Sequence, residues 1–170
     1  AQSAATMDKN TGLILWQKNA DQVRSIASIT KLMTALVFLD NNPGWDTEIT
    51  LEKQDEINGG TNRILRGEVV TVHDIFYTSL IASDNNATRA LVRSTGVLEE
   101  EFIQKMNNKA KELNLANTNF VDPTGLKDNN KSTALDILSL AKVAFDNQYI
   151  NDAVSKAVYN FQAISGANHK

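Results

Sequence analysis

A serine and a lysine that stand three residues apart open an apolar segment of this 170-residue chain. Ser28 and Lys31 belong to the sequence Ser-Ile-Thr-Lys, and the apolar side chains from residue 28 to residue 40 follow helical spacing. Residues three apart on a helix lie on the same face, so the hydroxyl and the amine can come within hydrogen-bonding distance. The spacing therefore predicts a nucleophilic serine whose proton passes to a lysine.

The surroundings of Lys31 favour this chemistry. It is the only charged side chain between Arg24 and Asp40, and an ammonium in an apolar helix loses hydration, which lowers its pKa toward the range of a general base. Free backbone N–H groups and the positive end of the helix dipole favour negative charge developing on Ser28. A serine at a helix start is also a common cap, so Ser-x-x-Lys by itself leaves a structural interpretation open.

A second polar pattern, Ser83-Asp84-Asn85, falls where one predicted helix gives way to another. Short polar side chains on such a turn can point into a cleft, although Asp and Asn are frequent in turns for local hydrogen-bonding reasons too. Ser83 and Asn85 are therefore candidate site residues. Asp84 is assigned no chemical role.

The elements that would position these residues are mainly helices. Two β-favouring runs, residues 4–8 and 13–17, flank Asn-Thr-Gly and predict an opening β-hairpin. Periodicity predicts a buried helix over 28–40, a helix after a capping box of Thr71 and Asp74, a short helix near 87–93, and a longer one with Phe102, Met106, Ala110 and Leu113 inward.

Further along, Ser132 or Thr133 is expected to cap a helix that turns Leu138, Ala141 and Phe145 inward. A short helix at 150–157, a strand at 158–162 and a short strand near 49–51 complete the pattern. A mainly helical body with a little β-sheet indicates the α+β class.

Together, the two polar patterns resemble the active-site serine families of penicillin-binding proteins and class A β-lactamases, whose motifs are Ser-x-x-Lys, Ser-x-Asn and Lys-Thr-Gly. The likeness is greatest to the D-alanyl-D-alanine carboxypeptidase and endopeptidase group of low-molecular-mass penicillin-binding proteins. Four segments carry it in the family's order: residues 7–12, 26–35, 120–126 and 132–136. The chain resembles the amino-terminal part of such a serine DD-peptidase.

The resemblance implies that Ser28 attacks a D-Ala carbonyl of a peptidoglycan stem peptide and forms an acyl-enzyme, while Lys31 takes its proton. Ser83 would relay a proton toward the leaving amine, and Asn85 would hydrogen-bond the substrate's amide. β-Lactams would acylate Ser28 because they imitate the D-Ala-D-Ala end. Neither a cofactor nor a metal is implied, the location is periplasmic or otherwise extracytoplasmic, and carboxypeptidase and endopeptidase both stay open.

The third motif of the family, Lys-Thr-Gly, occurs nowhere in the sequence. By the resemblance, the fold is β-lactamase/transpeptidase-like, and the opening hairpin belongs to an antiparallel sheet whose remaining strands lie beyond this chain. Residues 1–170 are then expected to be a single incomplete domain, inactive or weakly active alone, with a complementary carboxyl-terminal segment as partner. Trimming, proteolysis and natural loss are alternative causes.

Composition narrows the other possibilities. The net charge of −3 is spread without long runs of one sign, which argues against a nucleic-acid partner, and the absence of cysteine excludes disulfides and thiolate chemistry. His73 is expected at the surface rather than as a metal ligand. Two functional alternatives remain: a non-catalytic module that binds muropeptides or β-lactams, and a serine β-lactamase, for which no convincing Glu-x-x-Leu-Asn loop is found.

Overall fold

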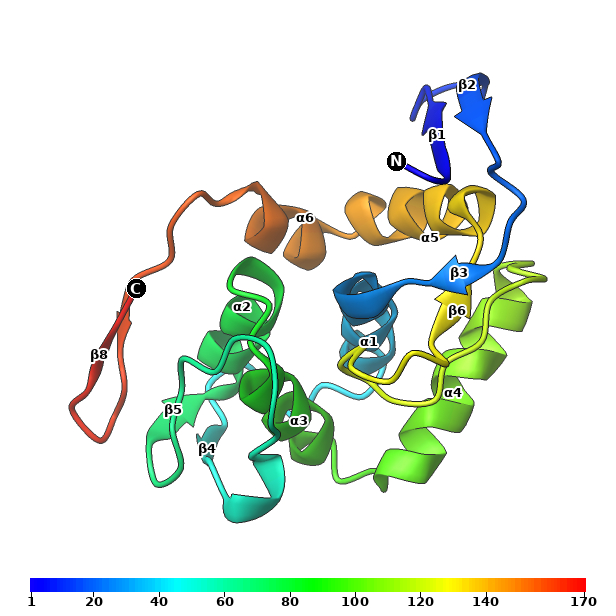
Figure 1. Ribbon diagram of the computed structural model, residues 1–170. Coiled ribbons are helices and arrows are strands. Elements are labelled where there is room, and N and C mark those ends of the chain that lie inside the picture. Colours follow the sequence, from blue (N-terminus) through cyan, green and yellow to red (C-terminus); the bar gives the residue numbers. More distant parts are fainter.

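A computed structural model describes all residues, 1–170, and places one helix at the centre of the molecule (Figure 1). That helix, α1, packs against four others, α2, α3, α4 and α5. The six α-helices are α1 (Thr30–Leu39), α2 (Val72–Ile81), α3 (Asn85–Ser94), α4 (Glu99–Glu112), α5 (Ala134–Asp146) and α6 (Gln148–Ser155). Two 3-10 turns, η1 (Ala27–Ile29) and η2 (Lys53–Asp55), add to them.

The β-structure consists of four separate two-stranded antiparallel sheets, β1-β2, β3-β6, β4-β5 and β7-β8. Their strands are β1 (Ala4–Met7), β2 (Ile14–Lys18), β3 (Arg24–Ser25), β4 (Glu48–Thr50), β5 (Val69–Thr71), β6 (Lys131–Ser132), β7 (Phe161–Gln162) and β8 (Asn168–His169). The β3-β6 pairing matters for the site, because it brings the segment before α1 beside the segment before α5. The α+β class predicted from the sequence is confirmed.

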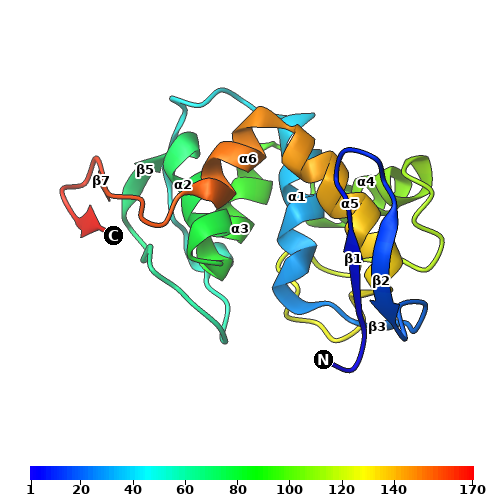
Figure 2. The same ribbon diagram turned by 90° about the horizontal axis from the view of Figure 1, so that it is seen from above.

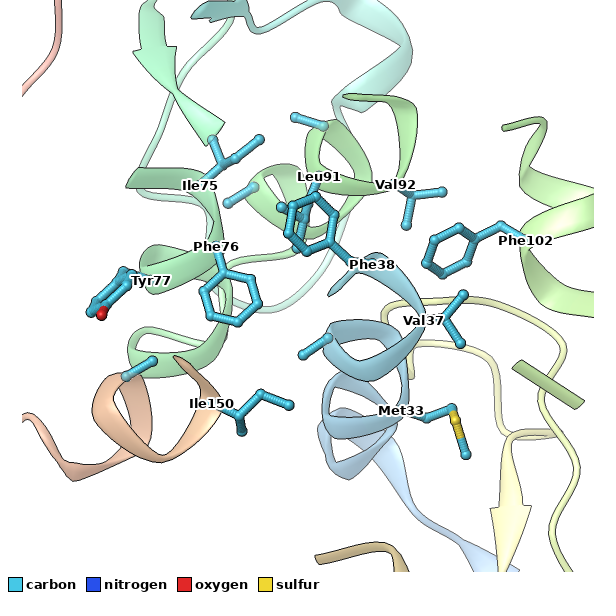
Figure 3. Packing of buried hydrophobic residues seen from close by; sticks show 14 of the residues in the cluster. Met33, Val37, Phe38, Ile75, Phe76, Tyr77, Leu91, Val92, Phe102 and Ile150 are labelled. Atoms are coloured by element: carbon cyan, nitrogen blue, oxygen red, sulfur yellow. The ribbon is translucent and has the colours of Figure 1, made fainter. Parts of the chain in front are cut away.

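The core is built around α1, whose apolar side chains point to several neighbours at once (Figure 3). Phe38 is fully buried and its ring lies 5.6 Å, centroid to centroid, from that of Phe76 on α2. Met33 of α1 and Phe102 of α4 are fully buried as well. Burying each such side chain stabilises the fold by about 1.5–3 kcal/mol. The first turn of α1 is therefore held in a fixed orientation.

Several helix predictions are confirmed in detail. The capping box of α2 is present, since Thr71 Oγ1 accepts from the Asp74 N–H at 3.1 Å and the Asp74 carboxylate accepts from the Thr71 N–H at 3.2 Å. On α5 the predicted inward face is only partly right, since Phe145 packs against the core but does not mark its centre. The fully buried residues of α5 are Leu140 and Ala144, whereas Leu138, Ala141 and Phe145 are half-buried.

The reason is that α5 is shared between three neighbours. It packs against α1, α6 and β1, so no single stripe of the helix faces the core alone.

His73 also departs from expectation. It is half-buried, its ring stacks on that of Tyr77 with the centroids 4.3 Å apart, and Nδ1 lies 2.9 Å from the Tyr159 hydroxyl. The ring belongs to an aromatic cluster rather than to the open surface.

The β1-β2 hairpin lies along α5 at one edge of the molecule (Figure 2). Every residue of β2 is exposed, including Trp16 with 55% and Leu15 with 61% of the surface accessible. Apolar side chains of this size in a strand normally pack against another layer.

None of the helices is both long and apolar enough to cross a membrane.

Candidate active site

Ser28 lies in the 3-10 turn η1, immediately before α1, and not in the first turn of the α-helix as the sequence predicted. The preceding residue, Ala27, has φ of 46°, a left-handed conformation that costs an alanine about 1–2 kcal/mol. Ser28 follows this bend and is exposed, whereas Thr30 and Lys31 behind it are buried.

Lys31 reaches back from the first turn of α1 to Ser28. Its Nζ donates to Ser28 Oγ at 3.2 Å, to Asn85 Oδ1 at 2.8 Å and to the Thr124 carbonyl at 2.8 Å. The residue is only 3% exposed. All three N–H donors of the ammonium thus have an acceptor, and these acceptors come from three separate parts of the chain.

The pKa of Lys31 is lowered from its ordinary value to about 8 because burial removes water from the ammonium. The carboxylates of Asp122 and Asp84 oppose this shift by stabilising the charged form. A neutral amine keeps two N–H donors and gains one lone pair. Because Asn85 Oδ1 and the Thr124 carbonyl can only accept, they would retain the two N–H groups and leave the lone pair for the Ser28 hydroxyl.

Asn85, the first residue of α3, has both ends of its amide engaged within the protein. Oδ1 accepts from Lys31, and Nδ2 donates to the Gly59 carbonyl at 2.9 Å. The loop that holds Gly59 and Gly60 approaches Asn85 so closely that a Cβ added at Gly60 would collide with Asn85 Nδ2. The structure therefore places Asn85 beside the serine–lysine pair. Its role toward a substrate amide stays a prediction, and that role requires Nδ2 to leave Gly59.

Ser83 is not joined to the pair. It is half-buried and its backbone has φ of 54°, again in the left-handed region. Its hydroxyl makes no hydrogen bond to any protein group, whereas hydrogen bonds link Ser28, Lys31 and Asn85 into one cluster. The expected hydrogen-bonded arrangement of Ser28, Lys31 and Ser83 is thus only partly formed. A proton-relay role for Ser83 stays a prediction.

Asp84, to which the sequence assigned no chemical role, has a structural one. Its carboxylate is fully buried and accepts from the backbone N–H groups of Ala87 at 2.8 Å, Ile64 at 3.2 Å and Arg63. Burial raises the pKa of this carboxyl, and the backbone hydrogen bonds oppose the rise. Asp84 caps α3 and anchors the 57–66 loop to it. An Asp directly before a helix is the sequence signal that could have predicted this cap.

The turn at 122–127 is another part of the site to which the sequence analysis gave no role, although residues 120–126 carry part of the family resemblance. The Asp122 carboxylate gathers the turn by accepting from the Thr124 N–H at 2.7 Å and the Gly125 N–H at 2.8 Å. Thr34 of α1 donates to the Pro123 carbonyl at 2.7 Å. The turn thereby presents the Thr124 carbonyl to Lys31. Its sequence, Asp-Pro-Thr-Gly, is typical of a turn and does not by itself indicate a site.

No three His, Cys, Asp or Glu side chains converge as a metal-binding group. What the cluster can do is acid–base and nucleophilic chemistry: an exposed hydroxyl lies within reach of a buried amine with a lowered pKa.

Comparison with known proteins gives a consistent result. Residues 1–165 match the family described as D-alanyl-D-alanine carboxypeptidase. The chain is 37% identical over 152 residues to the D-alanyl-D-alanine endopeptidase of Haemophilus influenzae, covering 88% of this chain and 52% of that protein. It is 39% identical over 140 residues to the D-alanyl-D-alanine endopeptidase of Pseudomonas aeruginosa, covering 81% of this chain and 45% of that protein.

The crystal structure of a Streptomyces DD-transpeptidase has the same fold, with a TM-score of 0.89 at 29% identity over 99% of this chain and 70% of the other. The chain spans about half the length of the curated relatives it matches.

Proposed function

The chain belongs to the D-alanyl-D-alanine carboxypeptidase family, and from this membership we propose that it carries the nucleophile and base of a serine DD-peptidase. The resemblance inferred from the sequence is thereby confirmed at the level of the family. One observation supports the activity above all: Lys31 Nζ, buried and with a pKa lowered to about 8, lies 3.2 Å from the exposed Ser28 Oγ.

The proposed reaction proceeds through an acyl-enzyme on Ser28. The hydroxyl proton passes to neutral Lys31 as Oγ bonds to the carbonyl carbon of a D-Ala residue, and the carbonyl π electrons move onto its oxygen. Collapse of that tetrahedral species breaks the C–N bond. The proton now on Lys31 passes to the leaving amine, with Ser83 as the proposed relay, so that Lys31 is neutral again and the acyl group stays on Ser28 as an ester.

Hydrolysis then completes the cycle. Water gives a proton to Lys31 and attacks the ester carbonyl, and Ser28 Oγ leaves with the proton that Lys31 returns. Asn85 would hold the substrate through its Nδ2, which must first exchange the Gly59 carbonyl for a substrate carbonyl. A β-lactam would follow the first half of this path with its ring amide in place of the D-Ala amide.

The proposed substrates are the D-Ala-containing peptides of peptidoglycan, which implies action outside the cytoplasm. As a partner we propose a complementary carboxyl-terminal segment that packs against the β1-β2 hairpin, making residues 1–170 one part of a larger domain. Two facts support it: the relatives are about twice as long as the matched region, and the outer strand of the hairpin exposes Leu15 and Trp16.

Fluorescent penicillin tests this function in the complete gene product that contains the chain. We expect covalent labelling that Ser28→Ala abolishes while circular dichroism stays unchanged. Labelling retained in Ser28→Ala would overturn the assignment of the nucleophile. Release of D-Ala from a D-Ala-D-Ala peptide distinguishes an enzyme from a binding module, since a module would be labelled without turnover. Rapid hydrolysis of the penicilloyl group would instead indicate a β-lactamase.

A further inference from the structure

Asn130 is a fully buried polar residue between the 122–127 turn and β6. Its Nδ2 donates to Thr30 Oγ1 at 3.1 Å and to the Asp122 carbonyl at 2.9 Å. Its Oδ1 accepts from the N–H groups of Val121 at 2.6 Å and Asp122 at 3.2 Å. Two donors and two acceptor positions are all that an asparagine amide has. Every one of them is used inside the protein.

The partners of the Asn130 amide lie on two segments: the start of α1, which carries Lys31, and the turn that contacts Lys31. Thr30 is the first residue of α1 and directly precedes Lys31. Asp122 begins the turn whose Thr124 carbonyl accepts from Lys31 Nζ. The main chain of Asn130 adds a third connection, because its carbonyl accepts from the Ile26 N–H at 3.1 Å, just before the bend that presents Ser28. One residue therefore touches three segments that meet at the site.

The turn is stiff in itself but has few ties to α1. Inside the turn, the Asp122 carboxylate accepts from the N–H groups of residues 124, 125 and 127. Toward α1 it is held by Thr34, through the Pro123 carbonyl, and by Lys31 itself. Without Asn130, Thr34 would remain as the one tie to α1 that does not involve the reacting lysine. Loss of the Asn130 amide would therefore leave the turn freer to shift relative to α1.

We propose that Asn130 is a positioning residue for the serine–lysine pair: its buried amide fixes the 122–127 turn to the first residue of α1 and keeps the Thr124 carbonyl aimed at Lys31 Nζ. This role rests on the proposed function, in which Lys31 takes the Ser28 proton. Asn130 touches neither Ser28 nor Lys31 and acts on them through Thr30 and the turn. In the neutral form, the two N–H groups of Lys31 are held by Asn85 Oδ1 and the Thr124 carbonyl. If the Thr124 carbonyl moves out of line, the amine can rotate and its lone pair no longer points to Ser28.

Asn107 offers a matched control for a purely structural effect. It lies on α4 and also joins a helix to the segment just before the turn. Its Nδ2 donates to the carbonyls of Ile103 at 3.1 Å and Phe120 at 2.8 Å. Its Oδ1 accepts from the Phe120 N–H at 2.9 Å. Asn107 thus resembles Asn130 in hydrogen bonding but makes no hydrogen bond to α1 or to the 122–127 turn.

The test compares Asn130→Ala, Asn107→Ala, Thr30→Val and the Thr30/Asn130 double variant in the complete gene product. Acylation by fluorescent penicillin should slow about tenfold in Asn130→Ala, the effect of losing a hydrogen bond or two, and stay within about twofold of wild type in Asn107→Ala. Both single alanine variants should have a lower Tm. Thr30→Val and Asn130→Ala should combine with less than additive effect, because they remove the same contact.

A second readout does not depend on acylation. The pKa of Lys31, followed by NMR of its ε-carbon, should change in Asn130→Ala, because the turn both buries the ammonium, which lowers the pKa, and carries the Thr124 carbonyl and the Asp122 carboxylate, which favour the charged form. It should not change in Asn107→Ala. If wild-type protein is not acylated, the proposed function fails and the NMR titration still decides on Asn130.

Equal acylation loss in Asn130→Ala and Asn107→Ala, or an unchanged Lys31 pKa in Asn130→Ala, overturns the positioning role. Should Asn130→Ala fail to fold, Thr30→Val decides alone, because valine keeps the shape of threonine and removes only the Oγ1 acceptor. That variant should slow acylation about threefold, the worth of one buried hydrogen bond. Wild-type acylation by folded Thr30→Val would then refute the proposal.

Discussion

Gly125 packs directly against the backbone of Ala27, the residue before the candidate nucleophile. A Cβ added at Gly125 would collide with the Ala27 carbonyl and lie 2.9 Å from the Ser28 N–H nitrogen. Gly125 also has φ of 87°, which a side chain would disfavour. The 122–127 turn therefore contacts the site twice, through the Thr124 carbonyl on Lys31 and through Gly125 beneath Ser28.

This close approach predicts that Gly125→Ala lowers both stability and acylation. The free energy of unfolding should fall by about 2–5 kcal/mol, from the left-handed backbone and the forced contact together. Gly67→Ala is the matched control, because Gly67 has φ of 88° with nothing within 4 Å of the added Cβ. It should cost only the left-handed term of about 1–2 kcal/mol and leave acylation unchanged. Equal losses of stability in the two variants by chemical denaturation would contradict the packing argument.

The lowered pKa of Lys31 predicts the pH dependence of acylation. Only the neutral amine accepts a proton, and with a pKa of about 8 roughly one lysine in ten is neutral at pH 7. The rate constant for acylation should therefore rise about tenfold per pH unit below pH 8 and level off above it. A stopped-flow pH series measures this profile. A plateau that begins near pH 10.5, the ordinary value, would show that burial does not act on Lys31.

Replacing Lys31 by arginine tests the same assignment without a pH series. A guanidinium stays protonated at any working pH, so Lys31→Arg can donate to Asn85 and Thr124 but cannot accept the Ser28 proton. Acylation should fall by about 10²–10⁴, the usual worth of a positioned general base. A folded Lys31→Arg variant, verified by circular dichroism, that reacts at the wild-type rate would exclude Lys31 as the base.

Asp84→Asn should change stability and the pH profile together. An amide has one acceptor oxygen, so one side of residue 84 would turn an NH₂ group toward a backbone N–H, at a cost of about 1–3 kcal/mol. The negative charge of Asp84 raises the pKa of Lys31. Its removal should therefore move the midpoint of the acylation profile to lower pH. In the control Asp136→Asn, whose carboxylate accepts from Asn117 and Thr118, the midpoint should stay unchanged.

Local sequence signals predicted most of the helices because their causes are local. The capping box at Thr71 and Asp74 fixes the start of α2 through contacts three residues apart. The stripe Phe102, Met106 and Ala110 recurs at helical spacing, and all three side chains are buried. Where an element depends on distant partners the sequence said less. The strands β3 and β6 were not predicted, since two residues each pair only because the chain brings them together.

The same division applies to the site. Ser28 and Lys31 are three residues apart, so helical spacing alone predicted their proximity. The Thr124 carbonyl and Asn130 contribute main-chain and amide groups from about 90 to 100 positions further along the chain. Such groups carry no distinctive residue type, and no periodicity marks them. Ala27 likewise gave no signal, because its φ is in the left-handed region, which alanine does not favour.

The exposed strand β2 leads to the last prediction, which concerns the proposed complementary segment. Adding the region that the longer relatives have and this chain does not span should raise acylation by at least about tenfold, since a single oxyanion donor is typically worth two to three powers of ten. The same addition should shift the fluorescence of Trp16, now 55% exposed, to shorter wavelength. Trp16→Phe identifies that signal, and Leu15→Ser, at another exposed position of β2, should weaken the association. Acylation by the 170-residue chain as fast as by the completed protein would show that these residues already hold a self-sufficient site.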